Sequence, residues 1–185
     1  EADVTLLDTV RETHPDICFN IAEGLRGDAR ESHVPALLEM LGIPYTGSGV
    51  TTHAISLDKA ATKQLWRDAG LPTAPFQLFS HASAPMRPDI AFPLFVKPVR
   101  EGSGMGIDAR SIVRDEPALR EQVSWVIDTY RQAALVEQYL VGREFTVGLI
   151  GNRRVHGKLP TTEGRRRPDF YDDNGYHCFP VLEID

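Results

Sequence analysis

The segment 92–107, FPLFVKPVREGSGMGI, brings a short apolar run, a lysine and a glycine-rich turn close together. The run 94–96 is typical of a buried strand, Lys97 projects from that strand, and Pro98 ends its hydrogen-bonding ladder on one side. Glycines let backbone N–H groups approach an anion closely, and successive N–H groups form an anion-binding concavity. The segment therefore predicts a nucleotide-binding loop; a plain hairpin with a solvated lysine is the alternative.

Two familiar phosphate-binding motifs do not fit this loop. No Gly-Lys-Ser/Thr follows the glycines, and no helical pattern opens at Gly106, the last of them. These absences exclude a P-loop and a dinucleotide-binding fingerprint.

Composition restricts the class of protein. The chain has 185 residues, of which 42% are apolar and 25% charged, as in a soluble globular protein of one large or two small domains. A net charge of −6 disfavours a nucleic-acid surface, and the basic run 165–167 is short enough for a solvated loop. Cys18 and Cys178 have no disulfide or metal spacing, and Cys18 is expected to be buried and inert. We therefore expect a cytoplasmic protein without a membrane span or signal peptide.

Hydrophobic periodicity divides the chain into two regions. The first region, to about residue 50, predicts one α/β unit and looks like the end of a larger domain. The second predicts helices and strands of an α+β domain, and both chain ends look abrupt, as in a fragment. The expected helices are 4–13, 33–41, a helix from 56 or 58 to 69, and 115–131. The expected strands are 16–20, 43–45, 94–97, 134–140 and 144–150, with a proline-rich loop at 80–91.

Five segments, in this order and spacing, resemble D-alanine–D-alanine ligase, an ATP-grasp enzyme. They are IPYTGSGV (43–50), LDKAATK (57–63), AGLPTAPF (69–76), the segment 92–107, and LVEQYLVGREFTVGLIG (135–151). The resemblance covers roughly residues 16–151. It implies an α/β with α+β fold of the ATP-grasp type, with a nucleotide held between two sheet-bearing subdomains. Residues 1–50 then belong to a partial N-terminal α/β domain, and 51–185 to a partial ATP-grasp domain that lacks its C-terminal catalytic part.

The resemblance also implies roles for individual residues. Lys59 and Lys97 match lysines that contact ATP phosphates, and Glu144 matches an acid that binds the ribose hydroxyls. The flexible loop over the phosphates matches Glu101, Gly102, Ser103 and Gly104, and the adenine-reading backbone matches Glu137, Gln138 and Leu140. Ser103 and Tyr171 are the catalytic candidates. No metal ligand is assigned, although Glu183 and Asp185 are of the right type.

Several alternatives stay open. Lys59 is otherwise an exposed helix lysine, Glu144 a surface strand residue, and Glu137 a structural partner of Arg143. The tail has two registers: Leu159 and Pro160 followed by a lid that carries Tyr171, or an insertion over 152–178 followed by a strand at 179–184.

The chain also departs from the family pattern. The glycine loop has Ser103 followed by Gly104 where the family usually has two serines, and the segment 22–31 lacks the His-Gly pair and the Gly-Glu-Asp-Gly run. That segment borders the amino-acid site in the family, so the substrate is left open.

The implied reaction activates an amino-acid carboxylate with ATP and Mg²⁺ as an acyl phosphate, which a second amino acid's amine attacks. D-alanine is the first expectation for both amino acids, in the synthesis of peptidoglycan precursors. Another carboxylate–amine ligase and a catalytically incompetent nucleotide-binding protein are the alternatives. The expected partners are small-molecule amino-acid substrates, without nucleic acid or membrane, and a homodimer stays open.

Overall fold

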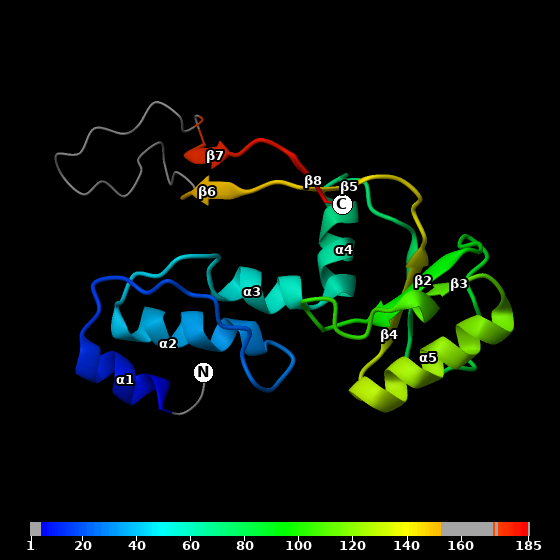
Figure 1. The fold of residues 1–185 in the computed structure, drawn as a ribbon, viewed down its shortest axis with the longest axis horizontal. Helices are drawn as coiled ribbons and strands as arrows, with labels where there is room; N and C mark the ends of the chain where they lie inside the picture. Colours follow the sequence, from blue (N-terminus) through cyan, green and yellow to red (C-terminus); the bar gives the residue numbers. More distant parts are fainter. Residues whose placement is uncertain (1–4, 153–171, 173, 185) are drawn as a thin grey trace. The chain divides into compact units, whose positions relative to one another are not determined.

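The computed structural model of the chain describes residues 5–152, 172 and 174–184 (Figure 1). These residues divide into two compact units, one ending at Leu140 and the other beginning at Val141. Each unit has its own β-sheet structure.

The first unit is built on an antiparallel sheet of four strands in the order β1-β4-β2-β3. The strands are β1 (Phe76–Phe79), β2 (Leu94–Pro98), β3 (Ile112–Val113) and β4 (Ala134–Gln138). Strand β4 lies between β1 and β2, and its register on β2 places Lys97 opposite Leu135 and Phe95 opposite Glu137. The predicted strand at 94–97 is confirmed, whereas the sequence did not predict β1 and β3.

Different side chains pack on the two faces of this sheet. Leu94 and Val96 point to the face covered by α5 (Glu116–Tyr130), where Leu119, Val123 and Val126 complete a fully buried core (Figure 1). Because side chains alternate along a strand, Phe95 and Lys97 point to the opposite face. On that face Leu135 packs with Phe76, Val99 and Ala60, the last from α4 (Lys59–Asp68). The sheet therefore directs Lys97 toward α4.

Helix α5 follows its sequence signals closely. The Asp115 side chain caps it by accepting a hydrogen bond from the Ala118 N–H at 3.0 Å, and Pro117 lies in the first turn. The helix ends where Arg131 adopts a left-handed conformation. The predicted helix over 115–131 is confirmed.

Helix α4 begins and ends at strong local signals. The Asp58 side chain accepts hydrogen bonds from the N–H groups of Ala60 and Ala61 at 3.0 and 2.9 Å. At the other end, the Leu71 N–H bonds to the Trp66 carbonyl at 2.8 Å, beyond Gly70 with its φ of +72°. The helix end predicted at residue 69 is confirmed to within one residue. The sequence analysis did not predict α3 (Val50–Leu57), a separate helix that ends where Asp58 leaves the helical conformation.

The N-terminal part of the first unit holds α1 (Leu6–Thr13) and α2 (His33–Leu41), both predicted. The strand predicted at 16–20 is wrong in extent, because only Cys18 pairs, in an isolated parallel bridge to Tyr45. Its apolar neighbours Ile17 and Phe19 are 61% and 79% exposed, and Cys18 itself is only partly buried. An extended segment that does not pair with neighbouring strands leaves most of its surface exposed to water, so no regular strand forms here.

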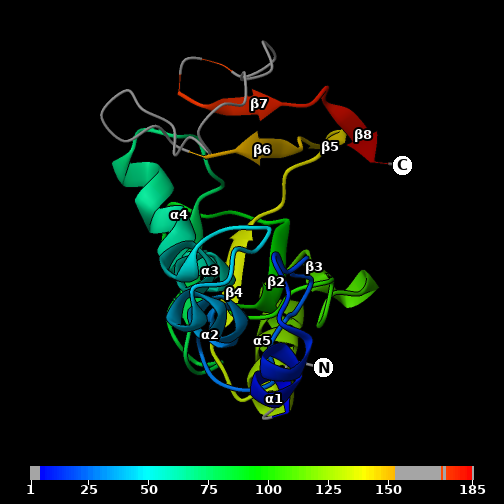
Figure 2. The same ribbon diagram turned by 90° about the vertical axis from the view of Figure 1, so that its left-hand side faces the viewer.

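The second unit consists of two short antiparallel pairs. Strand β5 (Glu144–Thr146) pairs with β8 (Leu182–Ile184), and β6 (Leu149–Gly151) pairs with β7 (Tyr176–Cys178), as Figure 2 shows for β6 and β7. The strand predicted over 144–150 is thus interrupted, at the point where the Gly148 carbonyl accepts the Phe179 N–H at 2.9 Å. The strand at 182–184 agrees with the second tail register, while residues 159–160 and 170–171 lie outside the described residues. No helix in the described part of the chain is long and apolar enough to cross a membrane.

The core beneath the sheet gives a first test. Leu119 of α5 is fully buried in this core, whereas Leu78 of β1 is 42% exposed. We expect Leu119→Ala to lower the free energy of unfolding by about 2–5 kcal/mol through lost burial and the cavity left behind. Leu78→Ala is the control and should cost much less. Urea denaturation followed by circular dichroism measures both, and equal losses would contradict this placement of the core.

Candidate functional site

Lys59, Lys97 and the glycine-rich loop line one cavity of about 280 Å³ in the first unit. Lys59 is the first residue of α4, and Lys97 comes from β2. A backbone hydrogen bond of 3.1 Å from the Lys59 N–H to the Val99 carbonyl fixes the start of α4 beside the end of β2. Two cationic side chains from different elements therefore face the same space, and Lys59 is not the freely exposed helix lysine of the alternative interpretation.

The loop over 101–106 forms the wall of this cavity. Its turns are closed by hydrogen bonds from Met105 N–H to the Gly102 carbonyl at 2.9 Å and from Ile107 N–H to the Gly104 carbonyl at 3.1 Å. Gly106 has a φ of +77°, and a Cβ there would lie 2.5 Å from Pro98 Cγ. The end of the loop thus packs directly against the strand that carries Lys97.

Side chains from two other segments hold the loop. The Glu101 carboxylate accepts hydrogen bonds from Arg30 at 2.8 Å and from the Gln132 amide at 2.7 Å. The Ser103 hydroxyl donates to the Glu23 carboxylate at 2.6 Å. Next to Glu23, the backbone of Gly24 lies close to that of Arg30. Only glycine fits there, since a Cβ at its φ of +71° would lie 2.1 Å from the Arg30 carbonyl oxygen. The segment 22–31, which departs from the family pattern, thus supplies two of these contacts, through Glu23 and Arg30.

Electrostatic strain is concentrated at Lys59. Burial and the nearby Lys97 ammonium lower the pKa of Lys59 below its ordinary value, and Glu101 offsets only part of this. The Lys59 ammonium donates to the Glu101 backbone carbonyl. Because like charges and desolvation both disfavour its charged form, an anion in the cavity would relieve the strain.

A buried ion cluster lies next to the cavity. The two oxygens of the Glu137 carboxylate bind different lysines, Lys97 and Lys63, the latter at 2.9 Å. Lys63 also donates to the Thr73 hydroxyl at 2.6 Å. Burial alone would raise the pKa of Glu137, but Lys97 and Lys63 outweigh it and hold the pKa below its usual range. The alternative pairing of Glu137 with Arg143 is wrong, because Arg143 pairs with Glu183 at 3.3 Å.

The remaining predicted site residues lie in several places. Gln138 holds the adjoining loop, with its side chain donating to the Pro93 carbonyl at 3.0 Å, and Leu140 is exposed. Glu144 lies on β5 in the second unit and is exposed there. Tyr171 and Asp185 fall outside the described residues. The described residues contain no group of three His, Cys, Asp or Glu side chains arranged to hold a metal.

Sequence reasoning missed Lys63, Arg30, Gln132 and the role of Glu23 at the loop. Only Lys63 carried a signal: it follows Lys59 by four residues in LDKAATK and so lies on the same helical face. The other contacts join residues that are 31 to 80 positions apart, which periodicity does not reveal.

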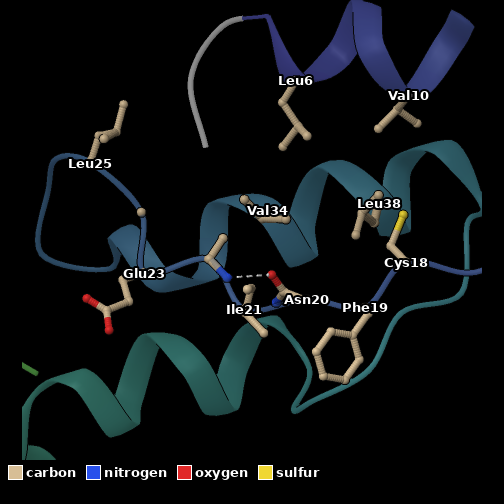
Figure 3. A pocket seen from close by; sticks show the side chains of 12 residues that line it. Leu6, Val10, Cys18, Phe19, Asn20, Ile21, Glu23, Leu25, Val34 and Leu38 are labelled. Atoms are coloured by element: carbon tan, nitrogen blue, oxygen red, sulfur yellow. Dashed lines mark hydrogen bonds between the residues drawn. The ribbon is translucent and has the colours of Figure 1, made fainter. Parts of the chain in front are cut away.

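A second, larger cavity of about 560 Å³ lies in the N-terminal part of the first unit. Apolar side chains from α1 and α2, among them Leu6, Val10 and Leu38, point into it (Figure 3). Asn20 orders its wall by accepting a hydrogen bond from the Ala22 N–H at 3.1 Å. This wall is mostly aliphatic, in contrast to that of the lysine cavity.

Comparison with known proteins places these features in a family. A family profile described as "D-ala D-ala ligase C-terminus" matches residues 65–178. The chain belongs to the D-alanine–D-alanine ligase family. The resemblance inferred from the five sequence segments, and the ATP-grasp fold expected from it, are thereby confirmed.

Individual relatives support this assignment. The protein y4sG of Sinorhizobium fredii, whose name carries no activity, is 39% identical over 171 residues, 88% of this chain and 49% of that protein. A D-alanine–D-alanine ligase of Halorhodospira halophila is 35% identical over 171 residues, 88% of this chain and 53% of that enzyme. The chain therefore spans about half the length of the curated relatives it matches.

A solved structure supports the fold. The D-alanine–D-alanine ligase of Bacillus anthracis, crystallised with ATP, has a TM-score of 0.66 and 21% identity, covering 100% of this chain and 53% of that one.

Two glycines in the loop allow a matched test of its packing. Gly104 and Gly106 have nearly the same φ, +76° and +77°, but only Gly106 faces a neighbour that an added Cβ would strike. Alanine at either position should cost about 1–2 kcal/mol of backbone strain. Gly106→Ala should cost a further 1–3 kcal/mol from overpacking against Pro98. Urea denaturation of both variants measures the difference, and equal costs would contradict the observed packing.

Proposed function

We propose that this chain is the nucleotide-binding part of an ATP-dependent carboxylate–amine ligase, with D-alanine–D-alanine ligation for peptidoglycan precursors as its reaction. One observation carries the proposal: Lys59 and Lys97 share a cavity with the glycine-rich loop. Membership of the ligase family and the ATP bound to the Bacillus anthracis relative support it. We place the protein in the cytoplasm, with small-molecule amino acids as its partners.

The cavity suits a triphosphate in charge and in construction. Two lysines supply positive charges that attract phosphate oxygens, and the glycine-rich loop lines the same space. Loops of this kind can offer backbone N–H groups to an anion. Burial and the neighbouring Lys97 ammonium lower the pKa of Lys59, and the negative charge of a phosphate would offset both effects. Mg²⁺ bound together with ATP would neutralise part of the phosphate charge.

The rest of the nucleotide is assigned from the family match. We propose that the backbone over 137–140 reads adenine, that Glu144 binds the ribose hydroxyls, and that the nucleotide lies between two sheet-bearing subdomains. A carboxylate accepts two hydrogen bonds from a diol, which suits Glu144. We also propose a boundary near residue 50, between an N-terminal α/β domain and an ATP-grasp domain.

In the proposed reaction, a carboxylate oxygen of the first amino acid attacks the γ-phosphorus and ADP leaves, which gives an acyl phosphate. The amine of the second amino acid then attacks the carbonyl carbon and releases phosphate. The protein acts by positioning and by charge neutralisation. Lys59 and Lys97 offset the phosphate charge, the loop excludes water, and Ser103 and Tyr171 are proposed to orient the reacting groups.

A second candidate is a ligase of the same kind with a different amino-acid pair. The observation in its favour is the contact of Glu23 with Ser103, together with the pairing of Arg30 with Glu101. These side chains come from the segment that departs from the family pattern.

Phosphate release tests both candidates. The protein is incubated with ATP, Mg²⁺ and a panel of D- and L-amino acids, and inorganic phosphate is measured. Release with D-alanine alone supports the first candidate, and release with another pair supports the second. ATP binding without release under any condition would contradict both and would favour a catalytically incompetent nucleotide-binding protein.

Lys97→Ala tests the phosphate site directly. We expect it to weaken ATP binding by about 1.5–3 kcal/mol, the scale of a lost hydrogen bond to a charged group. The control is Arg87→Ala, which removes a positive charge from a surface pair with Asp89. Calorimetric titration with ATP measures both variants. An unchanged affinity in Lys97→Ala would count against the assignment.

The pKa of Lys59 predicts the pH dependence of binding. Phosphate requires the charged ammonium, and the pKa of Lys59 lies below the ordinary 10.5. ATP affinity should therefore be highest below this lowered pKa and should fall as the pH rises through it. Lys59→Arg keeps its charge at alkaline pH, so its fall should shift to higher pH. Coincident profiles from titrations across pH would refute the role of Lys59.

A further inference from the structure

The ion cluster beside the lysine cavity contains two positive charges and one negative charge, all largely shielded from water. The side chains of Lys63, Glu137 and Lys97 are 9%, 13% and 20% exposed. Lys97 alone of the three lines the cavity that it shares with Lys59 within the described part of the chain. The cluster therefore presents its excess positive charge to the cavity through Lys97.

Lys63 is fully engaged away from the cavity. Its ammonium bonds to the Glu137 carboxylate at 2.9 Å and to the Thr73 hydroxyl at 2.6 Å, and it lies 5.3 Å from the centre of the Phe76 ring. These three partners come from β4, from the connection after α4, and from β1. A side chain held in this way acts on a ligand of the cavity only through the group it holds, which is Glu137.

Without Lys63, Lys97 and Glu137 would form a neutral ion pair in a poorly solvated setting. An incoming phosphate would then compete with a carboxylate for the same ammonium, and the carboxylate would also repel it. With Lys63 present, one oxygen of the Glu137 carboxylate binds Lys63, and the positive charge of Lys63 balances the negative charge of Glu137. Lys97 keeps its charge available while its position remains fixed by Glu137.

We propose that Lys63 is a positioning residue for ATP: it binds and neutralises the Glu137 carboxylate, so that Lys97 presents a net positive charge to the phosphates. This inference rests on the proposed function, because it requires that the cavity binds ATP. The proposed role of Lys63 differs from a purely structural role in one respect. The contribution of Lys63 to ATP affinity depends on the negative charge of Glu137.

A double-mutant cycle tests that dependence. The Kd for ATP is measured by calorimetry for the wild-type chain, Lys63→Met, Glu137→Gln and the double variant. We expect Lys63→Met to weaken binding about tenfold in the wild-type background. In the Glu137→Gln background, the same substitution should change the Kd by less than about threefold. Lys63→Arg, which keeps the charge, should bind nearly as tightly as wild type.

Two outcomes overturn the inference, and they are distinguishable. If Lys63→Met weakens binding equally in both backgrounds, Lys63 has a structural role only, while ATP binding itself stands. If the wild-type chain binds no ATP, the proposed function and this inference both fail. Thermal melting monitors folding of each variant, and Lys63→Gln, which retains a hydrogen-bond donor for Thr73, replaces Lys63→Met in the cycle should that variant not fold.

Discussion

Two ammonium groups, one at the start of α4 and one on β2, are held at the same cavity although their charges repel each other. A small set of contacts holds the two ammonium groups in place against this repulsion. Asp58 caps α4 so that the helix begins at Lys59, and the bond from Lys59 N–H to the Val99 carbonyl joins that helix to the end of β2. The core behind β2 and β4 keeps Lys97 on the face toward α4. The geometry of the site thus follows from packing of the sheet.

The same arrangement explains why the neighbouring acids are placed as they are. Glu137 neutralises part of the positive charge by pairing with Lys97, and Glu101 does so from the loop, where its carboxylate binds Arg30 and Gln132. Each acid is bound by a further cation or donor outside the cavity. The excess positive charge consequently remains at the point where the loop backbone meets the lysines, which is the place proposed for the phosphates.

Local signals in the sequence were sufficient for the elements that position the site. Three predictions each depended on a few neighbouring residues and were confirmed: the helix end near residue 69, the helix over 115–131 and the strand at 94–97. Contacts between residues far apart in the sequence could not be predicted from such local signals. The bonds of Ser103 to Glu23 and of Lys63 to Glu137 depend on the packing of distant segments. The strand expected at 16–20 failed for the same reason, since strand formation depends on neighbours that local pattern does not supply. The roles assigned to Glu144 and Tyr171 stay predictions.

Chemical modification of lysines with and without nucleotide tests the central claim most directly. Reductive methylation is followed by mass spectrometry at each lysine, in the absence of nucleotide, with ATP, and with AMP as the control that lacks the outer phosphates. If the two lysines bind the phosphates, ATP should slow modification of Lys59 and Lys97, and AMP should protect them far less. Equal modification rates at both lysines with and without saturating ATP would contradict the account.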